Sequence, residues 1–275
     1  MIIYQSRYLT RGEVWFDNHP GPERVDWILY HQRFQPTGKG TWRPFYTRLI
    51  DLTQVPEALL SQMDGFTASD IKKAQKKDGT TCHCLELSDR QVLEDFYQFY
   101  DRFAARKNLE PANRPWLTRT AEAGKLDLWV ARDPQGVPLV YHVLYCEPNR
   151  VRSMHLASFH AEAAAKEAQR RTGRASRCLH WNCMLHYRES RAQMYDLGGW
   201  YSGTSDLARM GINKFKEGFG GRVVCEFEGE QILTTKGWSA VAASRLLQKV
   251  KDWRVSRRQT HQPTLPLAPV LETNL

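Results

Sequence analysis

Three consecutive apolar segments, joined by two short turns, constrain the fold of this chain more than any other part of the sequence. The segments are residues 126–131, 137–145 and 151–159. Their connections, Asp133-Pro134-Gln135-Gly136 and Glu147-Pro148-Asn149-Arg150, are rich in residues that form tight turns. The sequence therefore predicts an antiparallel meander, in which each strand pairs with the next.

Further elements are predicted on both sides of this meander. Residues 12–50 alternate aromatic and polar positions, which is typical of a few antiparallel strands. Apolar spacing and turn residues predict helices at 56–77, 88–107, 115–124, 176–189 and 209–218, and strands at 80–87, 193–197 and 221–228. Thr67 is a candidate cap for the basic end of the first helix, and Ser88 or Asp89 for the second.

Composition narrows the class of protein. The chain has 275 residues, 41% hydrophobic and 25% charged, enough for one large domain or two small ones. No run of eighteen apolar residues occurs, and the N-terminus lacks the pattern of a signal peptide. We expect a soluble cytoplasmic protein without stable membrane insertion. The proline-rich stretch 259–275 is expected to be disordered or to form a docking strand.

The net charge of +9 favours a polyanionic partner such as nucleic acid, a nucleotide cofactor or anionic lipid. The charge is concentrated at 72–77, 170–177, 214–222 and 249–258. A solvated basic face explains such clusters equally well. The six cysteines have no C-x-x-C pair, so reduced thiols are expected. Alternation along a strand places His83 opposite Cys82 and Cys84, and no metal site is expected there.

A second informative segment runs from residue 194 to 224 and contains two glycine pairs. Gly198-Gly199 ends one apolar run, and Gly220-Gly221 opens another. Glycine permits backbone geometries and close approaches that other residues resist. The helical stretch between the pairs carries the sequence Lys214-Phe215-Lys216, where two cations can meet an anion. The alternative is a plain connector with solvated lysines.

The order of these elements resembles the GNAT N-acyltransferase fold over roughly residues 80 to 235. Within that fold, Y-D-L-G-G at 195–199, F-K-E-G-F-G-G at 215–221 and L-H-W at 179–181 are similar to the FemABX-like branch, the peptidoglycan bridge aminoacyltransferases and their relatives. The resemblance implies an α/β (α+β) fold with a mixed, mainly antiparallel central sheet flanked by helices. Those enzymes carry two GNAT-like domains, whereas the first 79 residues here supply only strands and one helix.

Three regions follow from this resemblance. Residues 1–79 form an N-terminal extension that packs on the core or a truncated first domain, residues 80–258 form the GNAT-like domain, and 259–275 form the tail. The resemblance also implies acyl transfer to an amine, with no tightly bound cofactor. In this scheme Lys216 lies at the aminoacyl-ester end of the donor and stabilises the oxyanion. Phe215 shapes the pocket or stacks on the terminal adenosine, and Lys214 helps to bind the donor.

Two residues are candidates for the general base, because the two strands that carry them splay apart in this fold to make the cleft. Asp196 follows Tyr195 near the end of one strand, and His155 lies on the third meander strand. Asp196 can equally cap the turn that follows it. The residues expected to shape the cleft are Tyr195, Gly198, Gly199, Gly220 and Gly221.

The donor is left open between two chemistries. Arg170, Gly173 and Ala175 fit the R-x-x-G-x-A form of the GNAT pyrophosphate loop, with Arg174 inside it, which favours acyl-coenzyme A. The preceding residues have strong helical propensity, so this stretch can instead be a helix end. The Phe-Lys motif and the basic charge favour aminoacyl-tRNA.

We prefer aminoacyl-tRNA as co-substrate and partner. The expected acceptor is a small amine, such as an amino sugar, an amino acid or a peptide of a cell-envelope or secondary-metabolite pathway. A third hypothesis, from another class, is a non-catalytic RNA-binding module built on the same scaffold.

Overall fold

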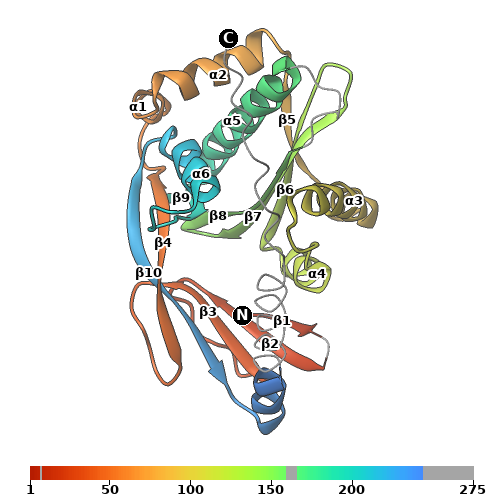
Figure 1. Ribbon diagram of the computed structural model, residues 1–275, viewed down its shortest axis with the longest axis vertical. Helices are drawn as coiled ribbons and strands as arrows, with labels where there is room; N and C mark the ends of the chain where they lie inside the picture. The colour runs from red at the N-terminus through yellow and green to blue at the C-terminus, as the bar shows by residue number, and fades with distance from the viewer. Residues whose placement is uncertain (7, 159–165, 244–275) are drawn as a thin grey trace, which may run out of the picture.

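All ten strands found in the described residues join one mixed sheet, in the order β1-β2-β3-β10-β4-β9-β8-β7-β6-β5 (Figure 1). The computed structural model describes residues 1–6, 8–158 and 166–243. The strands are β1 (Ile2–Ser6), β2 (Leu9–Trp15), β3 (Trp27–Arg33), β4 (Thr41–Asp51), β5 (Thr81–Leu85), β6 (Leu126–Arg132), β7 (Pro138–Glu147), β8 (Arg150–Ser158), β9 (Met194–Gly199) and β10 (Arg222–Ile232). The labelled helices are α1 (Pro56–Ser61), α2 (Gly65–Lys76), α3 (Arg90–Lys107), α4 (Arg114–Glu122), α5 (Lys166–Glu189) and α6 (Leu207–Glu217), and residues 235–243 are helical as well. The tail 259–275 and the basic cluster 249–258 lie outside the described residues.

The predicted meander is confirmed. β6 pairs antiparallel with β7, and β7 pairs antiparallel with β8. The first turn is held by Asp133, whose carboxylate accepts hydrogen bonds from the backbone N–H groups of Gln135 and Val137. Gly136 has a φ of +81°, which glycine adopts without the steric penalty of a side chain. The local turn chemistry therefore determines this part of the sheet.

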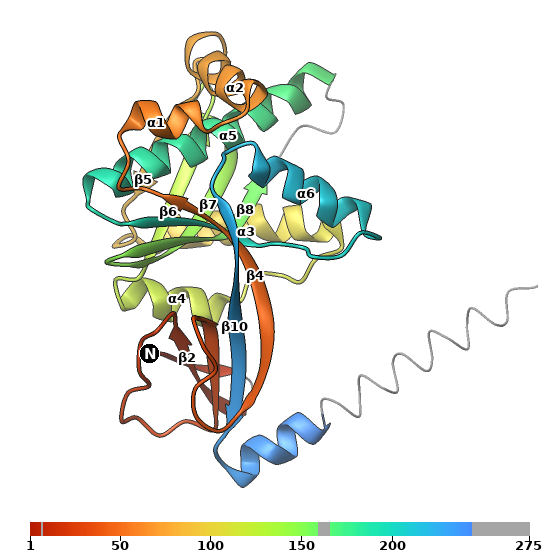
Figure 2. The ribbon, with the colours of Figure 1, turned by 90° about the vertical axis from the view of Figure 1, so that its left-hand side faces the viewer.

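The N-terminal strands differ from the prediction in direction. β2 and β3 are parallel, with Arg11 opposite Trp27, although residues 12–50 were expected to form a few antiparallel strands. The place beside β3 is taken by β10, which comes from the far end of the chain and lies between β3 and β4. Figures 1 and 2 show β4 and β10 as long strands that run from the helical half of the molecule into the half that contains β1–β3.

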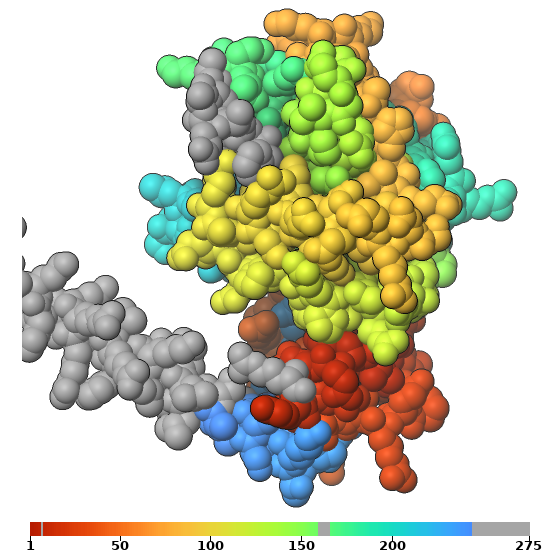
Figure 3. All heavy atoms as spheres, turned by 90° about the vertical axis from the view of Figure 1, so that its right-hand side faces the viewer, coloured from red at the N-terminus to blue at the C-terminus, as the bar shows by residue number. Residues whose placement is uncertain are grey.

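Helices cover both faces of the helical half, because strands β6 and β7 are apolar on both sides. On one face, α1, α2 and α5 bury a cluster that includes Ile71, Leu179 and Trp129. On the other face, α3 and α4 bury Phe96 and Leu117 with their neighbours. Figure 3 shows α3 and α4 (yellow) on this second face, above the N-terminal strands (red).

Two helix boundaries correct the sequence prediction. The helix expected at 56–77 is two helices, α1 and α2. The cap of α2 is Asp64, whose side chain accepts a hydrogen bond from Thr67 N, so Thr67 is not the cap. The helix expected to begin near residue 176 is already formed at Lys166. The Asp89 cap of α3 is confirmed.

Candidate active site

A cavity of about 800 Å³ opens where β8 and β9 separate. These two strands are parallel and pair over only three residue positions, from Arg150 opposite Met194 to Arg152 opposite Asp196. Beyond that point the strands diverge, and side chains from α5, α6 and the end of α3 complete the wall. The strands therefore splay apart, as the resemblance to the GNAT fold implied.

Gly198 is required at the point of divergence. Its φ is +77°, and a Cβ atom there would lie 3.0 Å from the backbone oxygen of Ser153 and 3.9 Å from Lys216 Nζ. A side chain at this position would therefore meet both β8 and the lysine. Gly199 follows, and a Cβ atom there would lie 3.3 Å from the Phe45 ring on β4. Both residues line the cavity.

Lys216 reaches the cavity from α6, and its Nζ donates a hydrogen bond of 2.5 Å to the carbonyl oxygen of Gly199. Burial lowers the pKa of Lys216 to about 8, and the nearby Arg152 adds to this effect, while Asp196 opposes it. The amine is therefore still mostly protonated at pH 7, but it gives up its proton far more easily than an ordinary lysine.

Phe215 also lines the cavity, beside the ring of His180 on α5. His180 is buried and its Nδ1 lies 2.9 Å from the hydroxyl of Tyr195. Burial lowers the pKa of His180 to about 3, with smaller contributions from Lys216 and Arg177. The cavity wall therefore contains a neutral imidazole beside a cationic lysine. Tyr195 itself is fully buried behind this imidazole.

Ser153 and His142 form a pair that the sequence patterns did not indicate. Ser153 lines the cavity from β8, and its Oγ lies 2.8 Å from Nε2 of His142 on β7. His142 is fully buried, and burial lowers its pKa well below the usual value, with the charge of neighbouring histidines as a secondary cause. The pair is separated by eleven residues and is brought together by the β7–β8 hairpin. Alternation along both strands was the only signal that could have suggested it.

Asp196 lies behind the cavity wall and is fully buried. Its Oδ2 accepts hydrogen bonds from Arg150 Nη2 (2.6 Å) and Gln32 Nε2 (2.7 Å), and its Oδ1 accepts from Gly198 N (2.7 Å) and the Thr47 hydroxyl. Burial alone would raise the pKa of Asp196, but the arginines and these hydrogen bonds lower it. The carboxylate thus holds the turn at Gly198, which matches the capping alternative for this residue.

Four other expected site residues, His155, Lys214, Gly220 and Gly221, do not line the cavity. His155 faces α3, where its ring meets Tyr100 edge to face at 4.9 Å, and burial together with Arg152 lowers its pKa to about 4. Lys214 is exposed on α6 and does not line the cavity. Gly220 and Gly221 form the turn from α6 into β10, where both have positive φ.

The stretch Arg170–Ala175 is not a loop, which corrects the pyrophosphate-loop expectation. It lies inside α5, where its backbone N–H groups are part of the helix. Arg174 is buried and pairs with Asp78 at 2.6 Å and with Glu167 at 2.8 Å. Ala175 is fully buried in the core. The helical propensity of the preceding residues therefore prevails over the motif.

A second hollow, of about 480 Å³, lies between α2 and α5 and is called the basic groove below. Its lining residues are Phe66, Asp70, Lys73, Lys77, Glu167, Arg170, Gly173, Arg174 and Arg177. Gly173 and Arg177 line the active-site cavity as well, so the two hollows adjoin. The guanidinium of Arg177 lies 5.0 Å from the rings of both Phe66 and Phe215. Arg177 therefore connects the groove to the Phe-Lys motif.

Comparisons with known proteins give only structural matches. No family model matches the sequence, and neither does any curated protein. The structure of FemX aligns with a TM-score of 0.55 and 14% identity over 71% of this chain and 63% of FemX. The structure of L-PGS from Bacillus licheniformis aligns with a TM-score of 0.50 and 13% identity over 80% of this chain and 72% of that one. The chain thus spans less than two thirds of the length of FemX.

In the described part of the chain, no helix has the length and apolar character needed to span a membrane. Strand order, the splayed β8–β9 pair and the structural matches agree with one another. The protein has a GNAT-like fold related to that of FemX.

Proposed function

We propose that this protein is an N-acyltransferase that moves an aminoacyl group from aminoacyl-tRNA to the amine of a small acceptor. The observation that carries the proposal is Lys216, a cationic donor in the wall of the cavity between β8 and β9, next to the Ser153–His142 pair. Acyl transfer to an amine needs a group that stabilises an oxyanion and a group that accepts a proton. Both lie on this wall.

Lys216 is proposed to stabilise the oxyanion that forms on the carbonyl of the donor ester. Its Nζ is held by the Gly199 carbonyl and has further protons to donate toward the cavity. A buried cation interacts more strongly with a developing negative charge than a solvated one does. Phe215, on the same helix, is proposed to contact the terminal nucleoside of the donor.

Ser153 and His142 are proposed to take the proton that the amine loses when it attacks the ester. The Ser153 hydroxyl can accept this proton while it passes its own to Nε2 of His142. In the tautomer that carries its proton on Nδ1, the neutral ring of His142 offers Nε2 as the acceptor, and its lowered pKa favours rapid return of the proton. Asp196 then serves as a positioning residue, because the hydrogen bonds that its carboxylate makes among the described residues all go to protein groups behind the wall.

The basic groove supports a nucleic-acid donor. Lys73, Lys77 and Arg170 are exposed there and can meet successive phosphates, while the exposed ring of Phe66 offers a stacking surface for a base. Because Arg170–Ala175 is helical, this stretch does not form the pyrophosphate loop that the R-x-x-G-x-A match suggested. Acyl-coenzyme A remains the alternative donor, and both donors place the reaction in the cytoplasm.

The test measures transfer of label from tRNA. Purified protein is incubated with tRNA carrying radiolabelled amino acids and with a panel of amino sugars, amino acids and short peptides, and base-stable amide products are counted. We expect transfer by the wild type, loss of at least 100-fold in Lys216→Met, and no change in Lys72→Met, which removes an exposed lysine of α2 outside the groove lining.

Other outcomes identify the competing functions. Transfer only from labelled acyl-coenzyme A would reject the tRNA donor. Tight binding of tRNA without transfer to any acceptor, unchanged in Lys216→Met, would reject catalysis and support an RNA-binding module.

A further inference from the structure

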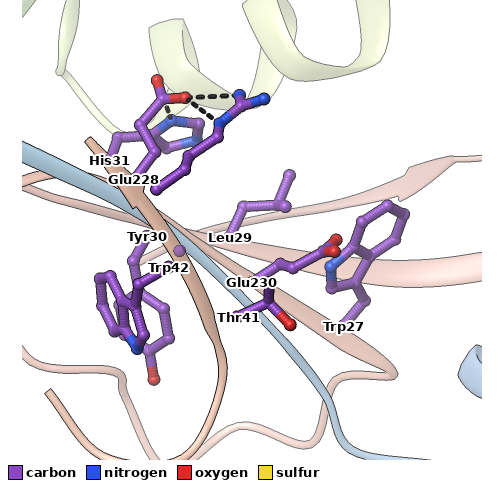
Figure 4. Close-up of a pocket in the computed structure, with 10 residues that line it drawn as sticks. Trp27, Leu29, Tyr30, His31, Thr41, Trp42, Glu228 and Glu230 are labelled. Atoms are coloured by element: carbon purple, nitrogen blue, oxygen red, sulfur yellow. Dashed lines mark hydrogen bonds and ion pairs between the residues drawn. The ribbon is translucent and has the colours of Figure 1, made fainter. Parts of the chain in front are cut away.

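A third hollow lies in the other half of the sheet, on strands β3, β4 and β10 (Figure 4). It has a volume of about 380 Å³ and is called the β3–β10 pocket below. Its lining residues are Trp27, Leu29, Tyr30, His31, Thr41, Trp42, Arg43, Glu228, Gly229 and Glu230. None of them takes part in the proposed acyl transfer.

The sheet register places most of these side chains on one face. Trp27, Leu29 and His31 alternate along β3 and therefore point the same way. Glu228 lies opposite Arg43, and Glu230 lies opposite Thr41 and Leu29, so their side chains join that face. Figure 4 shows Tyr30 and Trp42 on the opposite side of the strands. The pocket is thus one surface with an apolar part and a polar part.

The polar end contains a fixed arrangement of charges. Glu228 accepts hydrogen bonds from Arg43 Nη2 at 2.6 Å and Arg43 Nε at 3.2 Å, and its other oxygen lies 3.9 Å from His31 Nδ1. The other nitrogen of His31 lies 3.1 Å from Glu13, and its ring stacks on Trp15 at 4.1 Å. The Glu228 carboxylate is therefore already paired with Arg43, and Glu13 with His31. The polar end of the pocket thus offers hydrogen-bond donors and acceptors in fixed positions and carries little net charge.

The apolar end consists of Leu29 and the indole of Trp27. One side of the indole is fixed by Arg11, whose guanidinium lies 4.5 Å from the ring centroid. The indole Nε1 is buried and finds no acceptor among the described residues. Trp27 therefore contributes the apolar surface of its ring to the pocket rather than its N–H group.

We propose that the β3–β10 pocket binds a saccharide. Each sugar hydroxyl can both donate and accept a hydrogen bond. The pocket offers a donor in Arg43, an acceptor in Glu228, and a hydroxyl that can do both in Thr41. The C–H face of a sugar ring is apolar and fits the Trp27–Leu29 end. A polyanion is disfavoured by the carboxylates, and a simple ammonium ligand would have to displace the cations that already pair with Glu228.

Strand β4 runs from the β3–β10 pocket toward the active-site cavity. Thr41, Arg43 and Phe45 alternate along β4 and share one face. Phe45 lies against Gly199 and under the guanidinium of Arg152, both of which line the cavity. If the proposed transferase function holds, a saccharide bound here belongs to the acceptor, with its amine extending along β4. Saccharide binding itself does not depend on that function.

The test measures binding without any donor. Saturation-transfer NMR with a panel of neutral, amino and acidic mono- and disaccharides at millimolar concentration identifies a bound saccharide, and calorimetry then gives its affinity. We expect at least one sugar to bind, with affinity reduced at least tenfold in Trp27→Ala and in Thr41→Trp. Thr41 is exposed, so the larger residue fills the pocket without disturbing the core. Tyr8→Ala, which removes an exposed aromatic ring outside the pocket, is the matched control.

The outcomes are distinct. Absence of saturation transfer from every sugar overturns the proposal, and so does binding that is unchanged in Thr41→Trp. Binding of spermidine or lysine, but of no sugar, overturns it in favour of a cation site. Because no acyl donor is present, these results remain separate from failure of the transfer assay.

Discussion

Replacing Asp196 by asparagine separates its two possible roles, general base and buried support. The substitution keeps the shape of the side chain and removes its charge. In the structure, Oδ1 accepts from Gly198 N and the Thr47 hydroxyl, and an amide oxygen can keep both bonds. Oδ2 accepts from Arg150 and Gln32, so an amide nitrogen at that position would face two donors.

The expected cost follows from those two lost bonds. Hydrogen bonds to charged groups contribute about 1.5–3 kcal/mol each, and breaking a buried ion pair on one side costs about 3–5 kcal/mol. We therefore expect Asp196→Asn to lower the free energy of unfolding by about 3–5 kcal/mol, measured by urea denaturation with linear extrapolation. Glu122→Gln breaks the exposed ion pair with Arg119 and should cost less than about 1 kcal/mol.

The pH dependence gives a second measurement. The pKa of Asp196 is lowered in the folded protein, so its contribution is present above the unfolded pKa and is lost as pH falls through the folded pKa. The difference in stability between wild type and Asp196→Asn should shrink in acid accordingly. A loss below about 1 kcal/mol at neutral pH, together with abolished transfer, would refute the structural role and restore Asp196 as the base.

Three further predictions concern the cavity and its surroundings. If protonated Lys216 stabilises the oxyanion, the ratio of transfer by the wild type to transfer by Lys216→Met should fall as pH rises through about 8, the lowered pKa of this lysine. The ratio cancels the titration of the acceptor amine, and a ratio that stays constant there would contradict that role. Gly198→Ala should lower the free energy of unfolding, measured by urea denaturation, by about 1–2 kcal/mol, because residue 198 has a positive φ. It should also reduce transfer, because the new Cβ atom approaches the backbone oxygen of Ser153. If neither the stability nor the transfer rate changes, the steric argument is wrong. Asp64→Ala should lower the free energy of unfolding by about 1 kcal/mol, because the α2 cap loses the hydrogen bond from Thr67 N to the Asp64 carboxylate. An unchanged melting temperature would mean that this cap does not stabilise the protein.

Patterns in the sequence predicted features that depend on a few neighbouring residues. The β6–β7 turn at Asp133 and the Asp89 cap of α3 are both as expected. The position of Lys216 on a short helix between two strands is also as expected, and the resemblance placed it at a cleft. The pyrophosphate-loop prediction for Arg170–Ala175 was wrong because the same residues fit a helix equally well. In the structure they lie in α5, where Arg174 pairs with Asp78.

Contacts between distant segments could not be predicted in the same way. The alternation in residues 12–50 indicated strands, but it contained no information on the direction of β2 relative to β3 or on the arrival of β10 between β3 and β4. The Ser153–His142 pair depends on the register of β7 and β8, and a shift of one residue would turn one partner away.

The sequence by itself thus determined the order of helices and strands between residues 80 and 228, the turns of the meander, and Phe215 and Lys216 as candidate residues for the chemistry. These depend on backbone preferences that act within a few residues. Only the tertiary structure decided that Asp196 is enclosed by Arg150 and Gln32 and that Trp27 and Glu228 share a pocket. Burial and pairing between distant segments set these relationships, because the charges and rings involved meet only when the whole sheet has formed.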